Sequence, residues 1–216
     1  MLHRQSEWEV CDFQELREGS RLFHLDVGHE SASEQSVCPT LQLSNFRPGA
    51  KRSRDLKSRR KKLEAAGPVS FETVKELSGN EYIDALFRLH ATRWQQRRES
   101  GVLAHPNLKS FHTAVACGFG RHGFLRFHGL RFNEALMAVL YWFQHRRRVY
   151  SYIPAFDPAY SQYGPGSLLH YYALQYAAEA GDVECDFLRG AEEYKYRWGA
   201  QDRKNYRLPI TKELQD

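Results

Sequence analysis

Hydrophobic and polar positions alternate with a period of two between residues 124 and 158, which is typical of half-buried β-strands. Polar pairs interrupt the alternation and predict tight connections. We therefore predict three consecutive antiparallel strands, FLRFHGLRF (124–132), ALMAVLYWFQHRRR (135–148) and VYSYIPAFDP (149–158), joined at Asn133-Glu134 and Arg146-Arg147. In the last strand, the aromatic residues are expected on one packed face, at Tyr150, Tyr152 and Phe156.

Helical spacing precedes these strands. After a short strand at VSFETV (69–74), apolar residues three and four apart predict a helix over 81–97, with a stripe at Ile83, Leu86, Phe87, His90, Ala91 and Trp94. A second helix is predicted over 106–122, where apolar residues recur every four positions at Phe111, Val115 and Phe119.

A glycine turn opens the next helix, predicted over 166–180. The small residues Gly164 and Gly166 would let a phosphate approach the backbone, and the N–H groups of Gly166, Ser167 and Leu168 would point at it. An ordinary turn and helix cap is the alternative for this segment. A strand over 183–188 follows, with Cys185 and Phe187 on one face and Asp186 on the other, then a short helix near 191–198 and a last strand over 205–211.

Residues 47 to 198 resemble the acyltransferases of the GNAT superfamily, in particular the CelD and FemAB-like type with its BioF2-like acetyltransferase domain. The segments that carry this resemblance are KSRRKKLEAAG (57–67), LHATRW (89–94), YIPAFDPAYSQYGPGSLL (152–169), CDFLRGAEEYKYRWG (185–199) and YRLPI (206–210). The resemblance implies an α+β fold, whose central mixed, mostly antiparallel sheet has flanking helices and splays open between strands 149–156 and 183–188.

Members of this family usually carry two GNAT-like lobes. The resemblance therefore implies that residues 1–46 are the remnant of a first lobe and a linker, and that residues 47–216 form the acyltransferase domain. Most of the N-terminal lobe is expected to be missing. A truncated product, a partial sequence and a naturally short relative all remain open.

The activity implied is transfer of an acyl group from acyl-CoA, as cosubstrate, to an amine or hydroxyl of a sugar, a polysaccharide precursor or a similar acceptor. Direct attack in a ternary complex is expected, because no activated nucleophile is apparent. Two alternatives stay open: an aminoacyl transferase of the FemAB kind that uses aminoacyl-tRNA, and a non-catalytic lobe that binds a polyanion during polysaccharide assembly.

Within this interpretation, Asp186 is the expected general base or acceptor positioner, and Lys195 would neutralise a phosphate or the developing oxyanion. Structural ion-pair and surface roles are the alternatives for these two residues. The expected CoA-binding residues are Tyr163, Gly164, Gly166, Ser167 and Leu168, and the expected substrate-binding residues are Arg93, Trp94, Asp157 and Glu192. A core position is the alternative for Trp94, and a turn cap for Asp157.

Charge is concentrated in one segment. The segment from Arg47 to Lys62 contains nine Lys or Arg residues and a single acid, Asp55. Arg54, Lys57 and Lys61 would line one side of a helix. The segment is either a solvated connecting helix or a contact for a polyanion such as CoA phosphates, tRNA, a nucleotide-linked substrate or an anionic membrane.

Several classes of protein are not indicated. No stretch of 18 apolar residues predicts a transmembrane helix, and the polar start MLHRQSEWEVCDF does not resemble a signal peptide, so a cytoplasmic location is expected. Cys11, Cys38, Cys117 and Cys185 form no CxxC pair and the ten histidines form no HExxH motif. Reduced thiols and no bound metal are therefore expected.

Overall fold

A computed structural model describes residues 8–25, 32–44, 46–96 and 98–211 of the chain. The chain divides into two compact units. Unit 1 contains residues 1–40 and 188–216, and unit 2 contains the continuous segment 41–187.

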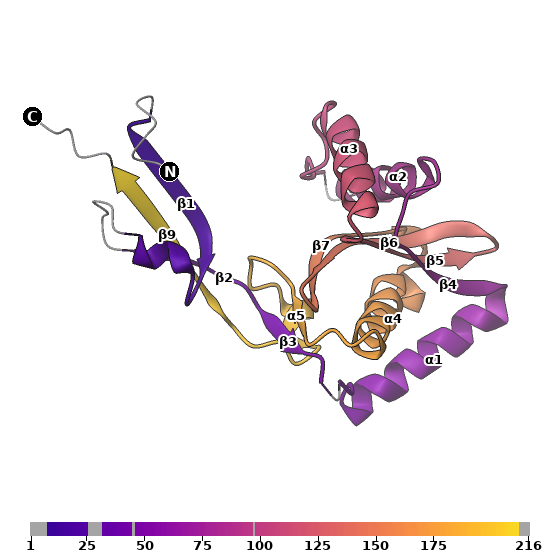
Figure 1. Ribbon diagram of the computed structural model, residues 1–216. Coiled ribbons are helices and arrows are strands. Elements are labelled where there is room, and N and C mark those ends of the chain that lie inside the picture. The colour runs from indigo at the N-terminus through magenta and orange to yellow at the C-terminus, as the bar shows by residue number, and fades with distance from the viewer. Residues whose placement is uncertain (1–7, 26–31, 45, 97, 212–216) are drawn as a thin grey trace, which may run out of the picture. The chain divides into compact units, whose positions relative to one another are not determined.

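Unit 2 is built on a six-stranded sheet with the order β3-β8-β7-β6-β5-β4 (Figure 1). The strands β4, β5, β6 and β7 pair antiparallel in sequence order, and β8 is parallel to β7. Their bounds are β3 (Thr40–Gln42), β4 (Val69–Val74), β5 (Leu125–Phe132), β6 (Ala135–His145), β7 (Arg148–Phe156) and β8 (Glu184–Asp186). The predicted mixed, mostly antiparallel sheet is therefore confirmed.

The two hairpins of this sheet turn at the predicted residues. Asn133 and Glu134 have φ of 47° and 67°, and Arg146 and Arg147 have φ of 49° and 60°. Two consecutive residues with positive φ are the signature of a type I′ turn, whose twist matches that of paired strands. Residues other than glycine adopt this conformation at a cost of about 1–2 kcal/mol each. The free energy of strand pairing must therefore outweigh that cost.

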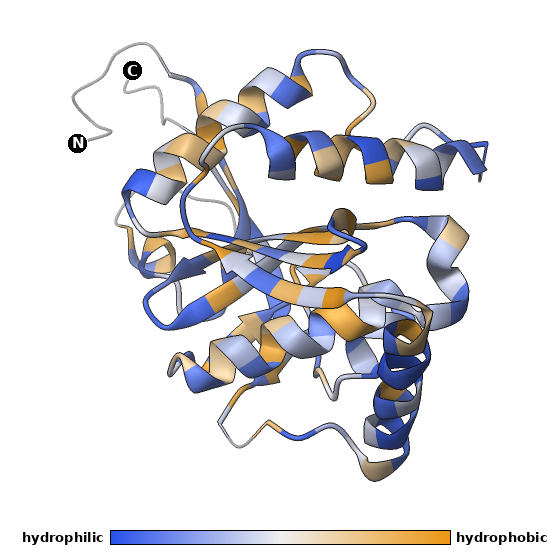
Figure 2. Ribbon diagram, turned by 90° about the vertical axis from the view of Figure 1, so that its right-hand side faces the viewer, coloured by the Kyte–Doolittle hydropathy of each residue, from blue (hydrophilic) through white to orange (hydrophobic). Residues whose placement is uncertain are grey.

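Helices cover both faces of the sheet (Figure 2). On one face lie α2 (Glu81–Gln96) and α3 (Leu108–Arg121); on the other lies α4 (Pro165–Glu179), which contacts α1 (Ala50–Ala66). Between α4 and β7 the chain forms a 3₁₀ segment, η3 (Pro158–Tyr163). No helix in the described ranges is long and apolar enough to cross a membrane.

The sheet face that is covered by α2 and α3 holds the main core of unit 2. Ile83, Leu86 and Leu89 of α2 are fully buried, as the predicted stripe requires at Ile83 and Leu86. They pack in a cluster with Phe127 and Tyr141, whose rings stack at 4.5 Å and 8°. Burying one such side chain contributes about 1.5–3 kcal/mol, so this helix is held mainly by its apolar face.

The helix α3 has a different orientation from the one its apolar spacing suggested. It buries His112, Ala116 and Gly120, while Phe111 and Phe119 are 56% and 36% exposed. Gly120 allows close packing, because a Cβ there would lie 3.3 Å from the Cα of Glu76. Small residues therefore let the helix approach its neighbours, and its aromatic row faces outward.

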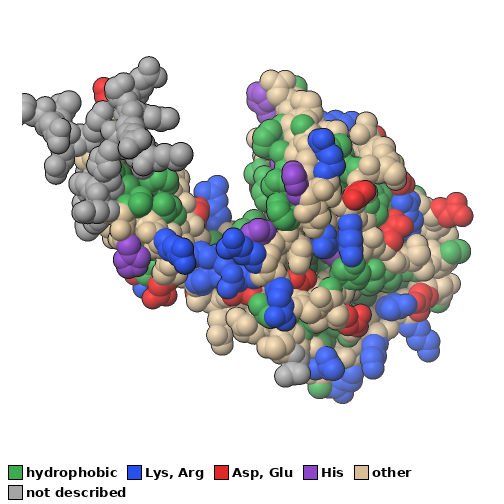
Figure 3. Space-filling view, viewed as in Figure 1, with side chains coloured by type: hydrophobic (Ala, Val, Ile, Leu, Met, Phe, Trp, Pro, Cys, Tyr) green, Lys and Arg blue, Asp and Glu red, His purple; other side chains and the backbone are tan. Residues whose placement is uncertain are grey.

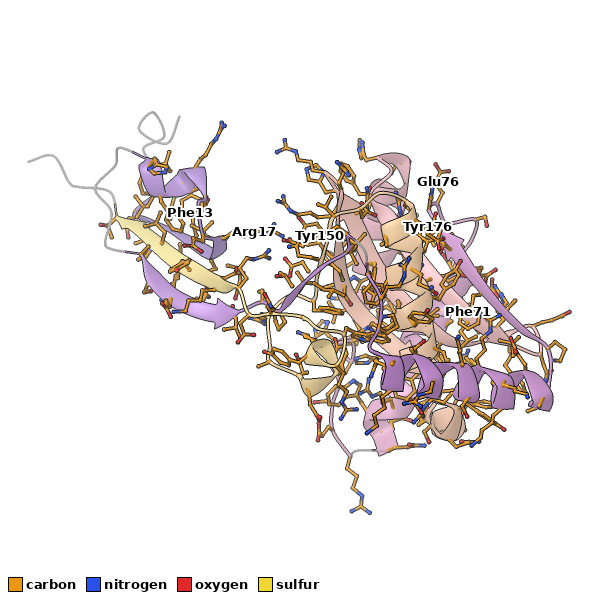
Figure 4. All side chains as sticks on the ribbon, turned by 90° about the horizontal axis from the view of Figure 1, so that it is seen from below. Phe13, Arg17, Phe71, Glu76, Tyr150 and Tyr176 are labelled. Carbon is orange, nitrogen blue, oxygen red and sulfur yellow. The ribbon has the colours of Figure 1, made fainter. Side chains whose placement is uncertain are left out.

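The opposite sheet face, which is covered by α4, carries a layer of aromatic and histidine side chains. His128 of β5 is 1% exposed, bonds Thr73 through Nδ1 at 2.8 Å and meets the Trp142 ring edge-on at 5.2 Å. Burial lowers the pKa of His128 to about 3, so this imidazole is neutral at pH 7. Figure 4 marks two other members of the layer, Phe71 of β4 and Tyr176 of α4.

The helix α1 confirms the prediction of a cationic helical segment. Leu56 and Leu63 are buried on one side of it. Its two acids are engaged in ion pairs, Asp55 with Arg59 at 2.8 Å and Glu64 with Arg60 at 2.7 Å. The exposed cations that form no ion pair within the described ranges are Lys51, Arg54, Lys57, Lys61 and Lys62. At 100° per residue these five residues occupy an arc opposite Leu56 and Leu63.

Unit 1 is a three-stranded antiparallel sheet in which the last strand of the chain lies in the middle. The order is β1-β9-β2, with β1 (Val10–Arg17), β2 (Ser33–Val37) and β9 (Lys204–Thr211). Two short helices, η2 (Arg21–His24) and α5 (Glu193–Tyr196), belong to this unit. The strand predicted over 205–211 is therefore present, but it pairs with the N-terminal strands.

This pairing changes the expected division of the chain. Residues 188–216 group with residues 1–40, although the sequence suggested one domain over 47–216. The physical reason is the hydrogen-bonded register of β9, which joins Ile210 to Cys11 and Tyr206 to Glu34. That residues 1–46 are the remnant of a first lobe stays a prediction.

Candidate active site

The sheet of unit 2 opens between β7 and β8, as predicted. The two strands pair only at Arg148–Glu184, Val149–Cys185 and Tyr150–Asp186. Beyond that point β8 ends, while β7 continues from Ser151 to Phe156. The backbone edge of β7 facing this opening has no partner strand among the described residues, so it can hydrogen-bond an extended ligand.

A β-bulge lies at the start of the opening. The register between β6 and β7 shifts between Tyr141–Ile153 and Trp142–Ser151, which leaves Tyr152 as the extra residue. A bulge bends its strand and re-aims a side chain. Tyr152 turns toward the α2 and α3 face, where its ring lies 5.6 Å from that of Tyr141. Phe156 lies against α4 instead, so the expected common face for Tyr150, Tyr152 and Phe156 is wrong.

The turn before α4 lies at the far end of β7. Gly164 has φ of 63° and ψ of 50°, a left-handed conformation that favours glycine, and Pro165 occupies the first helical position. The N–H groups of Ser167 and Leu168 both donate to the carbonyl of Gly164, at 3.0 and 3.1 Å. Only the N–H of Gly166 has no partner within the described residues, so the expectation of three available donors is wrong for Ser167 and Leu168.

Two guanidinium groups flank this turn. A Cβ on Gly164 would lie 2.8 Å from Nη1 of Arg59, so the α1 side chain stands directly beside the turn. A Cβ on Gly166 would lie 3.2 Å from the ring of Phe156, and the guanidinium of Arg93 lies 4.8 Å above that same ring. The fold therefore places Arg59 beside Gly164, and Arg93 on the Phe156 ring that borders Gly166. Cations at a helix start suit an anionic ligand.

The other expected residues near the turn have structural contacts. Asp157 caps η3, since its carboxylate accepts a hydrogen bond from the N–H of Ala159 at 2.9 Å. Leu168 is buried at 3% exposure and packs in the core. Trp94 is half-buried, meets His90 at 5.8 Å and contacts Gly101. Tyr163 ends η3 directly before Gly164.

Asp186 lies at the closed end of the opening. It is paired in register with Tyr150 and is 3% exposed. Strand alternation places its side chain on the α2 and α3 face, opposite Cys185. Burial raises the pKa of the Cys185 thiol well above its usual value, which excludes a reactive thiolate there.

The distance from Asp186 to the turn is larger than the sequence suggested. Six residue steps along β7 lead from Tyr150 to Phe156, which corresponds to about 20 Å at about 3.3 Å per step. From the sequence, the spacing of only about 5 Å between neighbouring strands predicts that Asp186 lies within about 10 Å of Gly166. That expectation ignored the length of β7, since the two residues lie at opposite ends of the strand.

Lys195 and Glu192 belong to unit 1 and are bonded to each other. The ammonium of Lys195 donates to the carbonyls of Leu188, Arg189 and Gly190 at 2.9–3.1 Å and pairs with Glu192 at 2.8 Å. Lys195 is 2% exposed. These contacts favour a structural role for Lys195, which ties together the loop after β8.

Among the described residues, no three His, Cys, Asp or Glu side chains gather as metal ligands would. The described cysteines are all free thiols.

The segment that contains the splayed sheet and the glycine turn matches a known family. The model of the acetyltransferase (GNAT) domain matches residues 50–196, well over half of the chain. The chain belongs to the GNAT acetyltransferase family.

Solved structures support the GNAT fold. FemX is similar with a TM-score of 0.69 and 10% identity, over 97% of this chain and 74% of FemX. L-PGS from Bacillus licheniformis has a TM-score of 0.66 and 13% identity, over 94% and 68% of the two chains. A tandem GNAT protein from the clavulanic acid biosynthesis pathway has a TM-score of 0.51 and 12% identity, over 100% and 68%. At these identities the likeness shows the fold alone. No curated protein matches the sequence significantly.

Sequence reasoning overlooked several residues of this candidate site. Arg59 was seen only as part of a charged segment, because nothing in the sequence indicated that α1 packs beside η3. His112, which contacts Tyr141 and Tyr152, was hidden by the more conspicuous aromatic row of α3. The alternation of VYSYIPAF gave no sign of the bulge at Tyr152, since a bulge adds one residue without changing composition.

Proposed function

We propose that this GNAT domain transfers an acyl group from acyl-CoA to an amine or hydroxyl acceptor. The observation that carries the proposal is the opening of the sheet, which starts beside Asp186 and ends at the glycine turn of α4. An elongated carrier with phosphates at one end and a thioester at the other suits an opening about 20 Å long.

The pyrophosphate would lie at the turn. It would approach the N–H of Gly166 and the start of the helix dipole, between the guanidinium groups of Arg59 and Arg93. Tyr163 and Ser167 would line the same turn. The amide groups of the pantetheine arm would bond the unpartnered edge of β7 as an added strand does.

The thioester carbonyl would then lie near the bulge at Tyr152. Asp186, on the same face of the sheet, would take the proton of the acceptor directly or through one water, which is typically worth about 10²–10⁴ in rate. Direct attack in a ternary complex agrees with the buried Cys185, whose raised pKa makes it a poor nucleophile. We further propose a sugar or polysaccharide precursor as acceptor and the cytoplasm as the location.

A titration of the full chain with CoA and a panel of acyl-CoA thioesters tests this proposal. We expect saturable binding in calorimetry and a higher melting temperature, by the linkage between binding and stability. Turnover is then sought with amine and hydroxyl acceptors. Absence of any CoA binding would refute the proposal.

A FemAB-like transferase that uses aminoacyl-tRNA is the second candidate. The observation that favours it is the outward face of α1, where Lys51, Arg54, Lys57, Lys61 and Lys62 are exposed next to the turn. A protein that neutralises several phosphates binds with a steep salt dependence.

Charge reversal of α1 separates the two candidates. The triple variant Lys57→Glu, Lys61→Glu, Lys62→Glu should weaken tRNA binding and flatten its salt dependence, while CoA binding at the turn should change little. If tRNA binds parent and variant equally at every salt concentration, the tRNA candidate fails. A polyanion that binds without any transfer activity would favour the non-catalytic alternative.

A further inference from the structure

Three rings from three elements converge beside the bulge of β7. The ring centroids of His112 in α3, Tyr141 in β6 and Tyr152 in β7 lie 5.6–5.8 Å from one another. Figure 3 shows hydrophobic side chains with histidines among them on the flank of unit 2 that carries α3 and β7. We call His112, Tyr141, Tyr152 and Phe111 the ring cluster.

The ring cluster has an exposed rim and a buried floor. Phe111 is 56% exposed and Tyr152 is 40% exposed, and both contact His112, with centroids 5.1 and 5.8 Å away. His112 and Tyr141 beneath them are 3% and 0% exposed. Two aromatic rings therefore meet solvent at the point where β7 and β8 part.

The floor contains polar atoms without partners. The hydroxyl of Tyr141 and Nδ1 of His112 are enclosed and make no hydrogen bond within the described residues. Buried polar groups of this kind are uncommon and call for an explanation such as a ligand or a water.

The ring cluster itself contains no charged side chain. Burial lowers the pKa of His112, so its imidazole is neutral at pH 7. The nearby cation of α3, Lys109, is paired with Asp84 at 2.7 Å. A neutral aromatic site is suited to a positively charged group, because ring faces carry negative potential.

We propose that the ring cluster is a subsite for the ammonium group of the acceptor, so that the preferred acceptor is an amine and not a hydroxyl compound. Phe111 and Tyr152 would hold the cation against their ring faces. This inference rests on the proposed acyltransferase function, because the bulge puts Tyr152 beside the expected position of the thioester carbonyl. The ammonium would pass one proton to Asp186, on the same sheet face. The neutral nitrogen would then attack the thioester carbonyl, so that the C–N bond forms as the C–S bond breaks, and the second nitrogen proton would go to the departing thiolate, which leaves as the thiol of CoA.

Two probes of equal shape test the subsite in the full chain. Choline carries a quaternary ammonium, and 3,3-dimethylbutan-1-ol has the same shape without the charge. We expect choline to shift the NMR signals of the His112 imidazole in a saturable manner and the alcohol to leave them unchanged. The signals are assigned by their loss in His112→Gln.

Matched variants locate the effect. Tyr152→Leu and Phe111→Leu should each weaken choline binding about two- to fivefold, the range for cation–π contacts at exposed sites. Phe119→Leu is the control, because Phe119 is also exposed on α3 but contacts Phe124 and Phe143 instead of His112. It should leave choline binding unchanged.

An equal response to both probes, no response to choline, or equal loss in the control variant would overturn the ammonium subsite. A parallel CoA titration separates this inference from the proposed function. If CoA binds and choline does not, the subsite fails and the proposed function stands. If CoA does not bind, the proposed function fails whatever choline does.

Discussion

Substitution of Gly166 by valine tests whether the turn of α4 binds phosphate. In the structure, the N–H of Gly166 is the donor of this turn that has no partner among the described residues. A β-branched side chain would cover it and fill the space in front of the Phe156 ring, since a Cβ already lies 3.2 Å from that ring. Loss of one hydrogen bond to a charged ligand costs about 1.5–3 kcal/mol, so the dissociation constant for CoA should rise about 10- to 150-fold.

The fold should tolerate this change. The backbone of Gly166 is helical, and the contact at 3.2 Å can be relieved by a small movement of the Phe156 ring. Valine has a better helix propensity than glycine by a few tenths of a kcal/mol. We therefore expect the melting temperature to change little, which leaves CoA affinity as the informative quantity.

Calorimetric titration of CoA into parent and Gly166→Val protein measures the effect. Gly118→Val is the matched control, because Gly118 is also helical, in α3, and a Cβ there meets nothing within 4 Å. Equal CoA affinity in parent and Gly166→Val, with both proteins folded, would refute phosphate binding at this turn.

Three further predictions concern single residues. Asp186→Asn should lower turnover by about 10²–10⁴ and leave CoA affinity unchanged; equal turnover from pH 6 to 9, roughly the range where such a base acts, would make Asp186 structural. Lys195→Met should destabilise the protein by about 1–3 kcal/mol in urea denaturation, because buried carbonyls lose their donor, whereas Glu192→Gln, at an exposed pair, should cost under about 1 kcal/mol; the reverse order would contradict the structural role. Burial lowers the pKa of His128 to about 3 and that of His170 to about 4, so the unfolded chain binds more protons below about pH 6.5. The contribution of these histidines to stability should be constant above that pH and fall below it by up to about 1.4 kcal/mol per pH unit for each histidine, and a His128→Gln variant with an unchanged slope of unfolding free energy against pH would contradict this.

The sheet and helices of unit 2 could be predicted from local pattern because each has a strong period. The hairpins at Asn133-Glu134 and Arg146-Arg147 followed from polar pairs between alternating strands. The orientation of α3 could not be predicted, because its apolar row and its small residues each define a face, and only packing decides which face is buried.

The candidate site was predictable only in part. The glycine turn is a local motif, and its position before a helix was visible in the sequence. The number of backbone N–H groups that can bind a phosphate depends on which of them donate to the Gly164 carbonyl. The spacing of residues in the sequence does not reveal those hydrogen bonds. Lys195 looked like a surface cation because its segment is rich in charged residues, Glu192, Glu193 and Arg197, whereas its burial depends on a loop that folds back around it.

The position of β9 between β1 and β2 has a consequence for synthesis on the ribosome. The central strand of unit 1 is made after all of unit 2, so β1 and β2 remain without their main partner until β9 emerges. Unit 2 is continuous in the chain and mostly built from neighbouring strands, so it can fold first. Until then the N-terminal strands have open edges, which are sites for mispairing between nascent chains. A chain truncated within 204–211 would lack part of β9, so the edges of β1 and β2 would stay unpaired.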